Sequence, residues 1–417
     1  MILALSTGGI ILYSITVFLF VIMSLVGILL FARDRLAPKG EVNLKINDLE
    51  MAVSPGSNLL STLSGNGIFL PSACGGGGTC GLCKCQIVEG GGSILPTETG
   101  FFTRKEQHNH WRLGCQVKIR ENLTIKVPEA ILGIKKWECE VISNNNVATF
   151  IKEFVVKLPE GEAMDFLPGG YVQIDVPKYE TSFRDFLIEE QYRNDWEKYG
   201  MWNFRISNKE ETFRAYSMAN YPAEKDLIKL NIRIATPPWD NTKKQYLNVP
   251  PGLCSTYIFA RKPGDKVIMS GPYGEFHIKD TKSEMIYIGG GAGMAPLRSH
   301  IFHLFNTLRT DRKVSYWYGA RSLREVFYED EFREIEKEFP NFTFILALSE
   351  PLPEDNWKGY TGFIHKVLLD NYLCEHESPE DIEYYFCGPP QMNNAVIKTL
   401  DMMGVPKENI AFDDFGI

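Results

Sequence analysis

PSACGGGGTCGLCKC, residues 71–85, places four cysteines and five glycines in fifteen positions, whereas the whole chain of 417 residues contains nine cysteines. A disulfide-stabilised scaffold is excluded, because cysteine exceeds roughly 8–10% of the residues in such small secreted domains. A glycine-rich stretch with crowded thiols can instead wrap its backbone closely around a metal centre. The segment therefore indicates metal or redox chemistry.

The spacing of the cysteines favours an iron–sulfur cluster. Cys74, Cys80 and Cys83 form a C-x5-C-x2-C pattern, and Cys115 follows after 31 intervening residues. Three thiolates on one tight loop and a distant fourth are how ferredoxin domains hold a [2Fe–2S] cluster. Cys85 is expected not to bind the cluster, because it lies on the strand that follows the loop and its side chain need not face the irons. The alternative is a structural zinc site, although such sites usually pair their ligands as C-x2–4-C twice and one such pair is present.

Residues 1–35 predict a transmembrane anchor. Ile11–Phe31 runs for 21 residues without a charge, which is the length that a helix needs to span a bilayer. A cleaved signal peptide would have a basic start and a shorter apolar core. A buried core helix is the remaining alternative. Arg33, Arg35 and Lys39 follow the apolar run, so the positive-inside rule places the rest of the chain in the cytoplasm.

Composition limits the partners and the number of domains. The net charge of −8 argues against nucleic acid as a partner, because binding phosphates requires a basic face. The length predicts two to four domains, and a hydrophobic content of 44% is ample for their cores.

Hydrophobic patterning beyond the anchor divides the chain into three parts. Residues 36–130 alternate in short runs and predict a small, mostly β domain of the α+β class that contains the cysteine segment. Residues 131–280 predict a second β domain, in which the charged and aromatic residues 178–211 form an insertion or lid. Strands that alternate with helices over residues 281–417 predict a parallel, doubly wound α/β domain.

The second domain contains residues suited to a phosphorylated, flat cofactor. In RAYSMAN, residues 214–220, Arg214 can bind a phosphate, Tyr216 can stack on a ring, and Ser217 can bond a ring nitrogen. Each residue alone is weak evidence, since an arginine beside a strand is more often a solvated charge and a tyrosine more often packs in a core.

The order of motifs in this domain resembles the FAD-binding β-barrel of the ferredoxin–NADP reductase superfamily. R-x-Y-S is followed by G-x-C-S-x-Y and then by K-P-G-D-x-V and S-G-P-Y-G-E-F. The resemblance implies that Arg214, Gly252 and Ser255 hold the FAD pyrophosphate. It also implies that Tyr216 and Ser217 face the isoalloxazine.

The third domain contains two motifs typical of nucleotide binding. GGGAGMAP, residues 289–296, follows a strand and opens a helix, where a pyrophosphate can approach free N–H groups. Its spacing differs from the dinucleotide fingerprint, so a plain structural turn is the alternative. With YFCGPPQM, residues 385–392, it resembles the nicotinamide half of the same superfamily. The resemblance implies a site that contains Gly290, Gly291, Gly293, Cys387, Gly388 and Pro389.

Three further features bear on this site. The resemblance implies that Cys387 lies beside the site of hydride transfer. The alternative is that Cys387 only packs as a small apolar residue at the end of a strand. Arg321 and Arg324 occur where a 2′-phosphate can bind, so these residues do not distinguish NADPH from NADH as the substrate. Phe415, near the C-terminus, is predicted to lie on the flavin face, as a terminal aromatic does in the superfamily.

The predicted cofactors together indicate an electron-transfer enzyme. A nicotinamide gives two electrons as hydride and an iron–sulfur cluster takes one at a time, so a flavin between them must separate the pair. We find no convincing Ser/His/Asp or paired-carboxylate arrangement among seven histidines.

The complete order of anchor, [2Fe–2S] domain, FAD domain and NADH domain resembles the F subunits of bacterial Na⁺-translocating NADH:quinone oxidoreductases. This resemblance implies NADH as the donor, a place in the bacterial inner membrane, and partner membrane subunits that reduce ubiquinone or menaquinone. Sodium transport must then belong to the partners, because one span offers no ion path.

Two other functions use parts of the same pattern. A reductase component that supplies electrons to a soluble oxygenase has the same three cofactor domains, but it should lack the anchor. A membrane-tethered adaptor with zinc in place of the cluster would be colourless and would not oxidise NADH.

Overall fold

The computed structural model describes residues 7–36, 40–225, 227–240 and 242–414. These fall into two compact units, residues 1–66 with 83–128, and residues 67–82 with 129–417. The cysteine-containing residues 67–82 thus group with the second unit, although the sequence analysis assigns them to the domain 36–130. The limits predicted for the three domains stay predictions.

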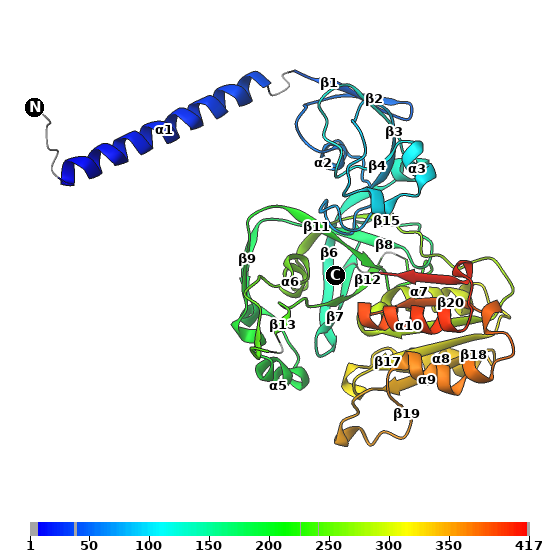
Figure 1. Cartoon of the computed structure of the whole chain (residues 1–417). Coiled ribbons are helices and arrows are strands. Elements are labelled where there is room, and N and C mark those ends of the chain that lie inside the picture. The colour runs from blue at the N-terminus through cyan, green and yellow to red at the C-terminus, as the bar shows by residue number, and fades with distance from the viewer. Residues whose placement is uncertain (1–6, 37–39, 226, 241, 415–417) are drawn as a thin grey trace, which may run out of the picture. The chain divides into compact units, whose positions relative to one another are not determined.

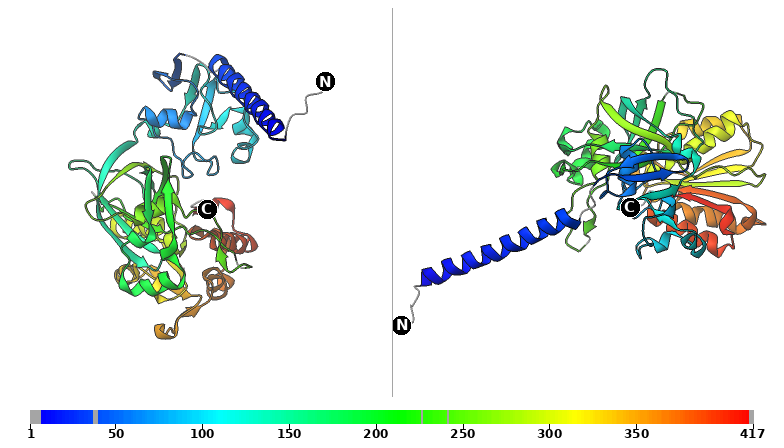
Figure 2. Two further views of the ribbon diagram at one scale, coloured as in Figure 1. Left: turned by 90° about the vertical axis from the view of Figure 1, so that its left-hand side faces the viewer. Right: turned by 90° about the horizontal axis from the view of Figure 1, so that it is seen from above.

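The N-terminal helix α1, Thr7–Leu36, is a single helix of 30 residues (Figures 1 and 2). Leu12–Ala32 is long and apolar enough to cross a membrane, by length and composition. Its side chains are exposed along almost the whole of this stretch. A helix that is apolar on every side and unburied is typical of a membrane span rather than of a core helix, which is the alternative that the sequence left open.

The first unit also contains a small mixed sheet in the order β2-β1-β5-β3-β4. Strands β1 and β5 are parallel, and the remaining pairs are antiparallel. Helix α2 buries three leucines, and α3 begins with a capping box between Thr103 and Glu106. The elements are β1 (Val42–Ile46), β2 (Leu49–Val53), α2 (Leu59–Gly65), β3 (Lys84–Glu89), α3 (Arg104–His108), β4 (Trp111–Leu113) and β5 (Leu123–Lys126).

A buried ion pair lies inside this unit. The Arg112 guanidinium is 2.8 Å from the Glu98 carboxylate, and the two side chains are 4% and 0% exposed. Arg112 also donates to the carbonyls of Gly91 and Gly92, and Glu98 accepts from the backbone N–H of Leu113. The pair therefore ties a glycine-rich turn to the end of β4, just before Cys115.

Residues 131–280 of the second unit, named the flavin domain after the cofactor that the resemblance implies, contain a six-stranded antiparallel sheet in the order β11-β8-β15-β6-β7-β12. An isolated bridge between Met218 and Leu230 connects its two edges, and the Ala219 N–H donates to the Lys229 carbonyl at 2.7 Å. This sheet agrees with the predicted antiparallel barrel. Its elements are α4 (Glu129–Leu132), β6 (Lys135–Ala148), β7 (Ile151–Lys157), β8 (Tyr171–Val176), β11 (Thr212–Ser217), β12 (Leu227–Arg233), α6 (Leu253–Phe259) and β15 (Lys266–Tyr273).

Residues 178–211 pack into the core of the flavin domain. They form β9 (Tyr179–Ser182), α5 (Glu190–Lys198) and β10 (Arg205–Asn208), and β9 pairs with β10. Trp196 and Phe183 are fully buried in the same hydrophobic cluster as the sheet residues. Lys152 is also buried and donates to the Leu187 carbonyl at 2.6 Å. The predicted insertion is thus anchored by its aromatic side chains. A short hairpin, β13 (Trp239–Asp240) and β14 (Gln245–Tyr246), follows β12.

The C-terminal part, residues 285–413, is the predicted doubly wound domain, and it is named the nucleotide domain after the ligand that its motifs predict. Its parallel sheet has the order β19-β18-β17-β16-β20-β21 (yellow to red in Figure 1). Alternate residues of β16 enter two clusters. Tyr287 packs with α7 and α8, whereas Ile286 and Ile288 pack with α9 and α10, so helices cover both faces. The bounds are β16 (Met285–Gly290), α7 (Met294–Phe302), β17 (Val314–Ala320), α8 (Glu329–Glu338), β18 (Phe342–Leu348), β19 (Tyr360–Thr361), α9 (Ile364–Asn371), β20 (Glu383–Cys387), α10 (Pro390–Met402) and β21 (Ile410–Asp413).

We predict that Arg112→Met strongly destabilises the first unit, because it leaves the Glu98 carboxylate buried without its cation. Such a loss costs about 3–5 kcal/mol. Amide hydrogen exchange in the full chain should show this loss of protection in β3 and β4. Glu50→Gln, which breaks an exposed ion pair with Lys45 in the same sheet, should leave protection unchanged. Equal effects of the two substitutions would contradict the prediction.

Candidate active site at the carboxyl edge of the nucleotide domain

The site lies where the strand order of the doubly wound sheet reverses. Strand β16 pairs with β17 on one side and with β20 on the other, and Gly289 is opposite Cys387. Ligands of open α/β sheets bind at the carboxyl ends of the strands at such a point. Both glycine motifs singled out in the sequence therefore meet at one edge.

The glycine turn after β16 is packed directly against the end of β20. A Cβ atom at Gly293 would lie 2.0 Å from the Cys387 carbonyl oxygen and 2.6 Å from the Gly388 nitrogen. Gly291 has a φ of +57°, a conformation that favours glycine. Pro389 lies close to Gly290, so all six residues predicted for the nicotinamide nucleotide come together. The turn is thus built for close approach of backbone to backbone or of backbone to ligand.

A hydrogen bond links the flavin domain to this edge. The Ser217 hydroxyl, at the end of β11, donates to the Asp413 carboxylate at 2.6 Å. Asp413 ends β21 and is the register partner of Cys387. Ser217 and Cys387, which the sequence analysis predicts as site residues, are therefore joined through an acidic residue that it missed.

Burial sets the protonation of these groups. It raises the pKa of the Asp413 carboxyl to about 6, against the lowering effect of the Ser217 hydrogen bond. Burial raises the pKa of the Cys387 thiol well above its usual value, and the nearby Asp413 adds to that rise. Cys387 is therefore a neutral thiol, and Asp413 exchanges a proton close to neutral pH.

The aromatic predicted for the flavin face, Phe415, lies outside the described residues. Phe412 is described, and its ring stacks on Phe386 with centroids 5.1 Å apart. The signal for Asp413 was present in the sequence as the acidic pair that precedes Phe415. An acidic pair by itself ordinarily indicates solvated charges, and the partner of Asp413 lies 196 residues away, so the sequence does not predict this site residue.

The four other residues that the sequence predicts to contact FAD occupy two neighbouring segments. Arg214 and Tyr216 lie on β11, Gly252 precedes α6, and Ser255 lies within it. Ser255 donates to the Gly252 carbonyl at 3.2 Å and accepts from the Ala235 N–H at 3.1 Å. A Cβ atom at Gly252 would lie 2.6 Å from that of Ala235. Ser255 thus holds the turn before α6 in shape.

The predicted cluster ligands form two neighbouring pairs, one in each unit. In the second unit the Cys80 thiol donates a hydrogen bond to the Cys74 sulfur and lowers the pKa of Cys74. The two sulfurs are therefore in contact. In the first unit the Gly114 N–H donates to the Cys83 carbonyl at 2.7 Å, which places Cys83 beside the turn that carries Cys115.

The donor set of thiols fits the group that the sequence predicts. No group of three metal-binding side chains meets around one point within the described residues. Each iron of a [2Fe–2S] cluster binds two cysteine thiolates, and the four predicted ligands are divided as one pair in each unit, so each pair is described by itself. Cys85 is fully buried and its thiol donates to the Arg112 carbonyl at 3.7 Å, which agrees with a non-ligand.

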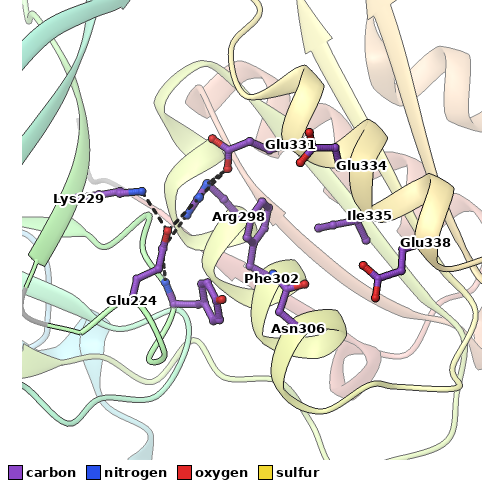
Figure 3. A pocket seen from close by; sticks show the side chains of 10 residues that line it. Glu224, Lys229, Arg298, Phe302, Asn306, Glu331, Glu334, Ile335 and Glu338 are labelled. Atoms are coloured by element: carbon purple, nitrogen blue, oxygen red, sulfur yellow. Dashed lines mark hydrogen bonds and ion pairs between the residues drawn. The ribbon is translucent and has the colours of Figure 1, made fainter.

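A cavity of about 410 Å³ lies away from these residues, between the end of the flavin sheet and helices α7 and α8 (Figure 3). Arg298 donates to Glu224 at 3.0 Å and to Glu331 at 2.6 Å, and Lys229 also pairs with Glu224. Glu334 and Glu338 add two more carboxylates to the wall (Figure 3). So acidic a lining does not suit an anionic nucleotide, and the ion pairs instead connect the flavin and nucleotide domains.

The arginines considered for a 2′-phosphate already have acidic partners. Arg324, which follows β17, donates to Asp195 of α5 at 2.6 Å and lies 3.8 Å from Glu354. Arg321 lies 3.8 Å from Glu325.

Comparison with known protein families identifies three cofactor domains. Residues 42–120 match the 2Fe-2S iron-sulfur cluster binding domain, residues 197–278 the oxidoreductase FAD-binding domain, and residues 287–398 the oxidoreductase NAD-binding domain. The chain therefore combines a [2Fe–2S] cluster, FAD and a nicotinamide nucleotide.

Curated relatives are similar over almost the whole chain. The F subunit of the Na(+)-translocating NADH-quinone reductase of Psychrobacter cryohalolentis is 55% identical over 96% of this chain and 98% of its own length. The F subunit of the Pseudomonas aeruginosa enzyme is 54% identical, with 97% and 98% covered. The F subunit of the Klebsiella pneumoniae enzyme is 53% identical, with 97% and 99% covered.

Solved structures share the fold. The Amycolatopsis cytochrome P450 reductase has a TM-score of 0.62 at 22% identity, and covers 90% of this chain and 98% of its own. The ferredoxin reductase in carbazole 1,9a-dioxygenase has a TM-score of 0.58 at 26% identity, with the same shares covered.

We predict that Asp413→Asn changes the pH dependence of stability. A folded-state pKa near 6, raised from 3.8, means that the wild-type carboxyl contributes stability that is complete below pH 3.8 and lost as pH rises through 6. Asparagine does not titrate, so the variant should not lose this stability. Its free energy of unfolding should therefore rise relative to that of the wild type by up to about 3 kcal/mol between pH 3.8 and pH 6. Thermal unfolding between pH 4 and pH 8 measures the difference, and parallel curves would contradict the prediction.

Proposed function

The chain belongs to the family of Na(+)-translocating NADH-quinone reductase F subunits, and we propose that it is the subunit through which electrons enter such a membrane complex. It oxidises NADH by transferring a hydride to FAD, and single electrons then leave through the [2Fe–2S] cluster to partner subunits. Those partners reduce quinone and translocate Na⁺. Identity of 53–55% over nearly the full length supports this function.

The observation that carries the proposal is the meeting of Ser217, Asp413 and Cys387 beside the glycine turn of a nucleotide domain. Residues of the flavin domain and of the nucleotide domain converge there. A hydride acceptor and a hydride donor must approach closely for transfer, and such convergence is the geometry required. The two domains are also held together by the ion pairs of Arg298.

The bound groups supply the redox chemistry, because FAD converts between hydride transfer and single-electron steps and the cluster carries single electrons. The residues of the chain position these groups. Gly290, Gly291 and Gly293 admit the nucleotide pyrophosphate to the turn before α7. Cys387, with Gly388 and Pro389, borders the nicotinamide.

On the flavin side, the Ser217 hydroxyl would face the isoalloxazine, and Asp413 orients that hydroxyl by accepting its hydrogen bond. A carboxyl with a pKa near 6 can also hold or release a proton there. Tyr216 would contact the flavin ring, while Arg214 and the turn of Gly252 and Ser255 would hold the FAD pyrophosphate. For Phe415, which lies outside the described residues, a place on the flavin face stays a prediction of the resemblance.

For the cluster we propose Cys74, Cys80, Cys83 and Cys115 as ligands. The glycines at 75, 76, 78 and 81 all have positive φ, which lets the backbone turn its N–H groups toward the thiolates. Soft thiolate ligands suit iron in both oxidation states.

Helix α1 supports a single-pass anchor in the bacterial inner membrane. Arg33, Arg35 and Lys39 follow its apolar part, which favours a cytoplasmic position for all three cofactor domains. NADH is then available from the cytoplasm. The path for Na⁺ and the quinone site belong to partner subunits.

A reductase that feeds an oxygenase remains the second candidate, because the ferredoxin reductase in carbazole 1,9a-dioxygenase shares the fold at 26% identity. The apolar helix α1 and the much higher identity to the F subunits favour the membrane complex. Transfer of electrons to a soluble oxygenase partner by a chain that lacks residues 1–35 would favour the second candidate.

We predict that Cys80→Ala abolishes reduction of the cluster, while NADH still reduces FAD. The reason is that the cluster loses a ligand but the hydride path from NADH to FAD is untouched. An anaerobic titration with NADH, followed by flavin and iron–sulfur absorbance and then by electron paramagnetic resonance, measures both steps. The wild type should show bleaching of both chromophores and a [2Fe–2S] signal.

Cys85→Ala is the matched control, because it removes a buried thiol from the same segment without removing a proposed ligand. This control should keep the cluster signal. Loss of both flavin and cluster reduction in a folded, FAD-loaded Cys80→Ala chain would refute the order of electron transfer.

A further inference from the structure

A cluster of arginines lies beside the nucleotide turn, at the carboxyl end of β17. Gly319 of β17 is the register partner of Gly290, and the Tyr318 hydroxyl donates to the Gly291 carbonyl at 3.4 Å. Arg321 and Arg324 follow directly. In doubly wound domains this strand end contacts the adenosine ribose, where NADH has a 2′-hydroxyl and NADPH a 2′-phosphate.

Carboxylates from three different segments neutralise these arginines. Arg324 donates to Asp195 of α5 at 2.6 Å, and Glu354 lies 3.8 Å away on its other side. The hydrogen bond to Asp195 raises the pKa of Arg324 further. Arg321 faces Glu325 at 3.8 Å. Arg233, the last residue of β12, also interacts with Arg321 and Glu325, so three cations and three anions meet at this strand end.

Asp195 is held in place by its neighbour. Trp196 is fully buried, and its indole N–H donates to the Thr149 carbonyl at 2.7 Å. The Thr149 hydroxyl and N–H in turn donate to Glu325. The Asp195 side chain is only 22% exposed. Its carboxylate therefore belongs to a connected network rather than to a loose surface helix.

We propose that Asp195, contributed by the segment 178–211 of the flavin domain, determines the preference for NADH by occupying Arg324 and so denying it to a 2′-phosphate. This inference rests on the proposed function, because it concerns the nucleotide that the same site oxidises. A 2′-phosphate is recognised by free arginines that can bind it in a bidentate manner. Here it would have to displace Asp195 and would face Glu325 and Glu354, whereas a neutral 2′-hydroxyl meets no such repulsion.

The test uses the full-length, FAD-loaded chain in detergent and two probes, adenosine 2′,5′-bisphosphate and adenosine 5′-monophosphate. Isothermal titration calorimetry of the wild type should show no gain in affinity from the 2′-phosphate. In Asp195→Asn the bisphosphate should bind about tenfold tighter or more, as expected for a new charge-assisted contact. The kcat/KM for NADPH should rise in step, and that for NADH should change by less than about threefold. The gain should shrink at high salt.

Two further variants identify the cause of the gain. Glu190→Gln removes a charge from the same helix at a side chain that is 89% exposed, and it should leave both affinities unchanged. Asp195→Asn combined with Arg324→Gln should abolish the gain, because the released arginine is then missing. An equal gain in Glu190→Gln, or a gain that survives loss of Arg324, would overturn the proposal.

Arg324→Gln alone keeps the proposal testable if Asp195→Asn fails to fold. In the otherwise unchanged chain it should not weaken binding of the bisphosphate, because Asp195 already occupies the arginine. A loss of more than about threefold would show that Arg324 binds the 2′-phosphate and would overturn the proposal. Failure of the proposed function is seen separately, as wild-type FAD that NADH does not reduce, and the probe titrations still decide the role of Asp195.

Discussion

The close approach of two backbone segments, the turn at Gly293 and the strand end at Cys387, is the constraint on which the site depends. A side chain at residue 293 would overlap the Cys387 carbonyl. Because the two segments touch, the ends of β16 and β20 lie at one edge, and β21 brings Asp413 to the same place. Ser217 of the flavin domain then meets Asp413, and a hydride donor and acceptor can be held face to face.

Buried charges hold the second unit in this arrangement. Arg298 on α7 binds the Ala219 carbonyl just beyond β11, and it also binds Glu224 and Glu331. A buried ion pair adds little net stability, because desolvation offsets most of the attraction, but loss of one partner is costly. Such pairs therefore act mainly to specify one packing of the flavin and nucleotide domains. The network around Asp195 and Glu325 joins the same two domains at a second place.

The sequence predicted those features whose chemistry is local. The apolar run of α1, the strands that alternate with helices in the last domain, the glycine turn and the four cysteines each follow from neighbouring residues, and the family comparisons confirm the three cofactors. Asp413 was missed because its partner, Ser217, is 196 residues away. The partners of Arg321 and Arg324 cannot be predicted for the same reason. The segment 178–211 has the charged and aromatic composition of an insertion or lid, because the burial of Trp196 depends on distant residues.

The sequence by itself determined the class of each domain and indicated the iron–sulfur cluster, because hydrophobic period, glycine turns and cysteine spacing act over a few residues, and the resemblance of its motifs to known families implied FAD and NADH. Tertiary structure alone decided which charges are free. Arg324 looks like a phosphate ligand in the sequence, yet in the fold it faces Asp195 from a segment 129 residues earlier. Electrostatic interaction depends on distance through space, and burial of Asp413 and Trp196 arises only when segments far apart in the chain pack together.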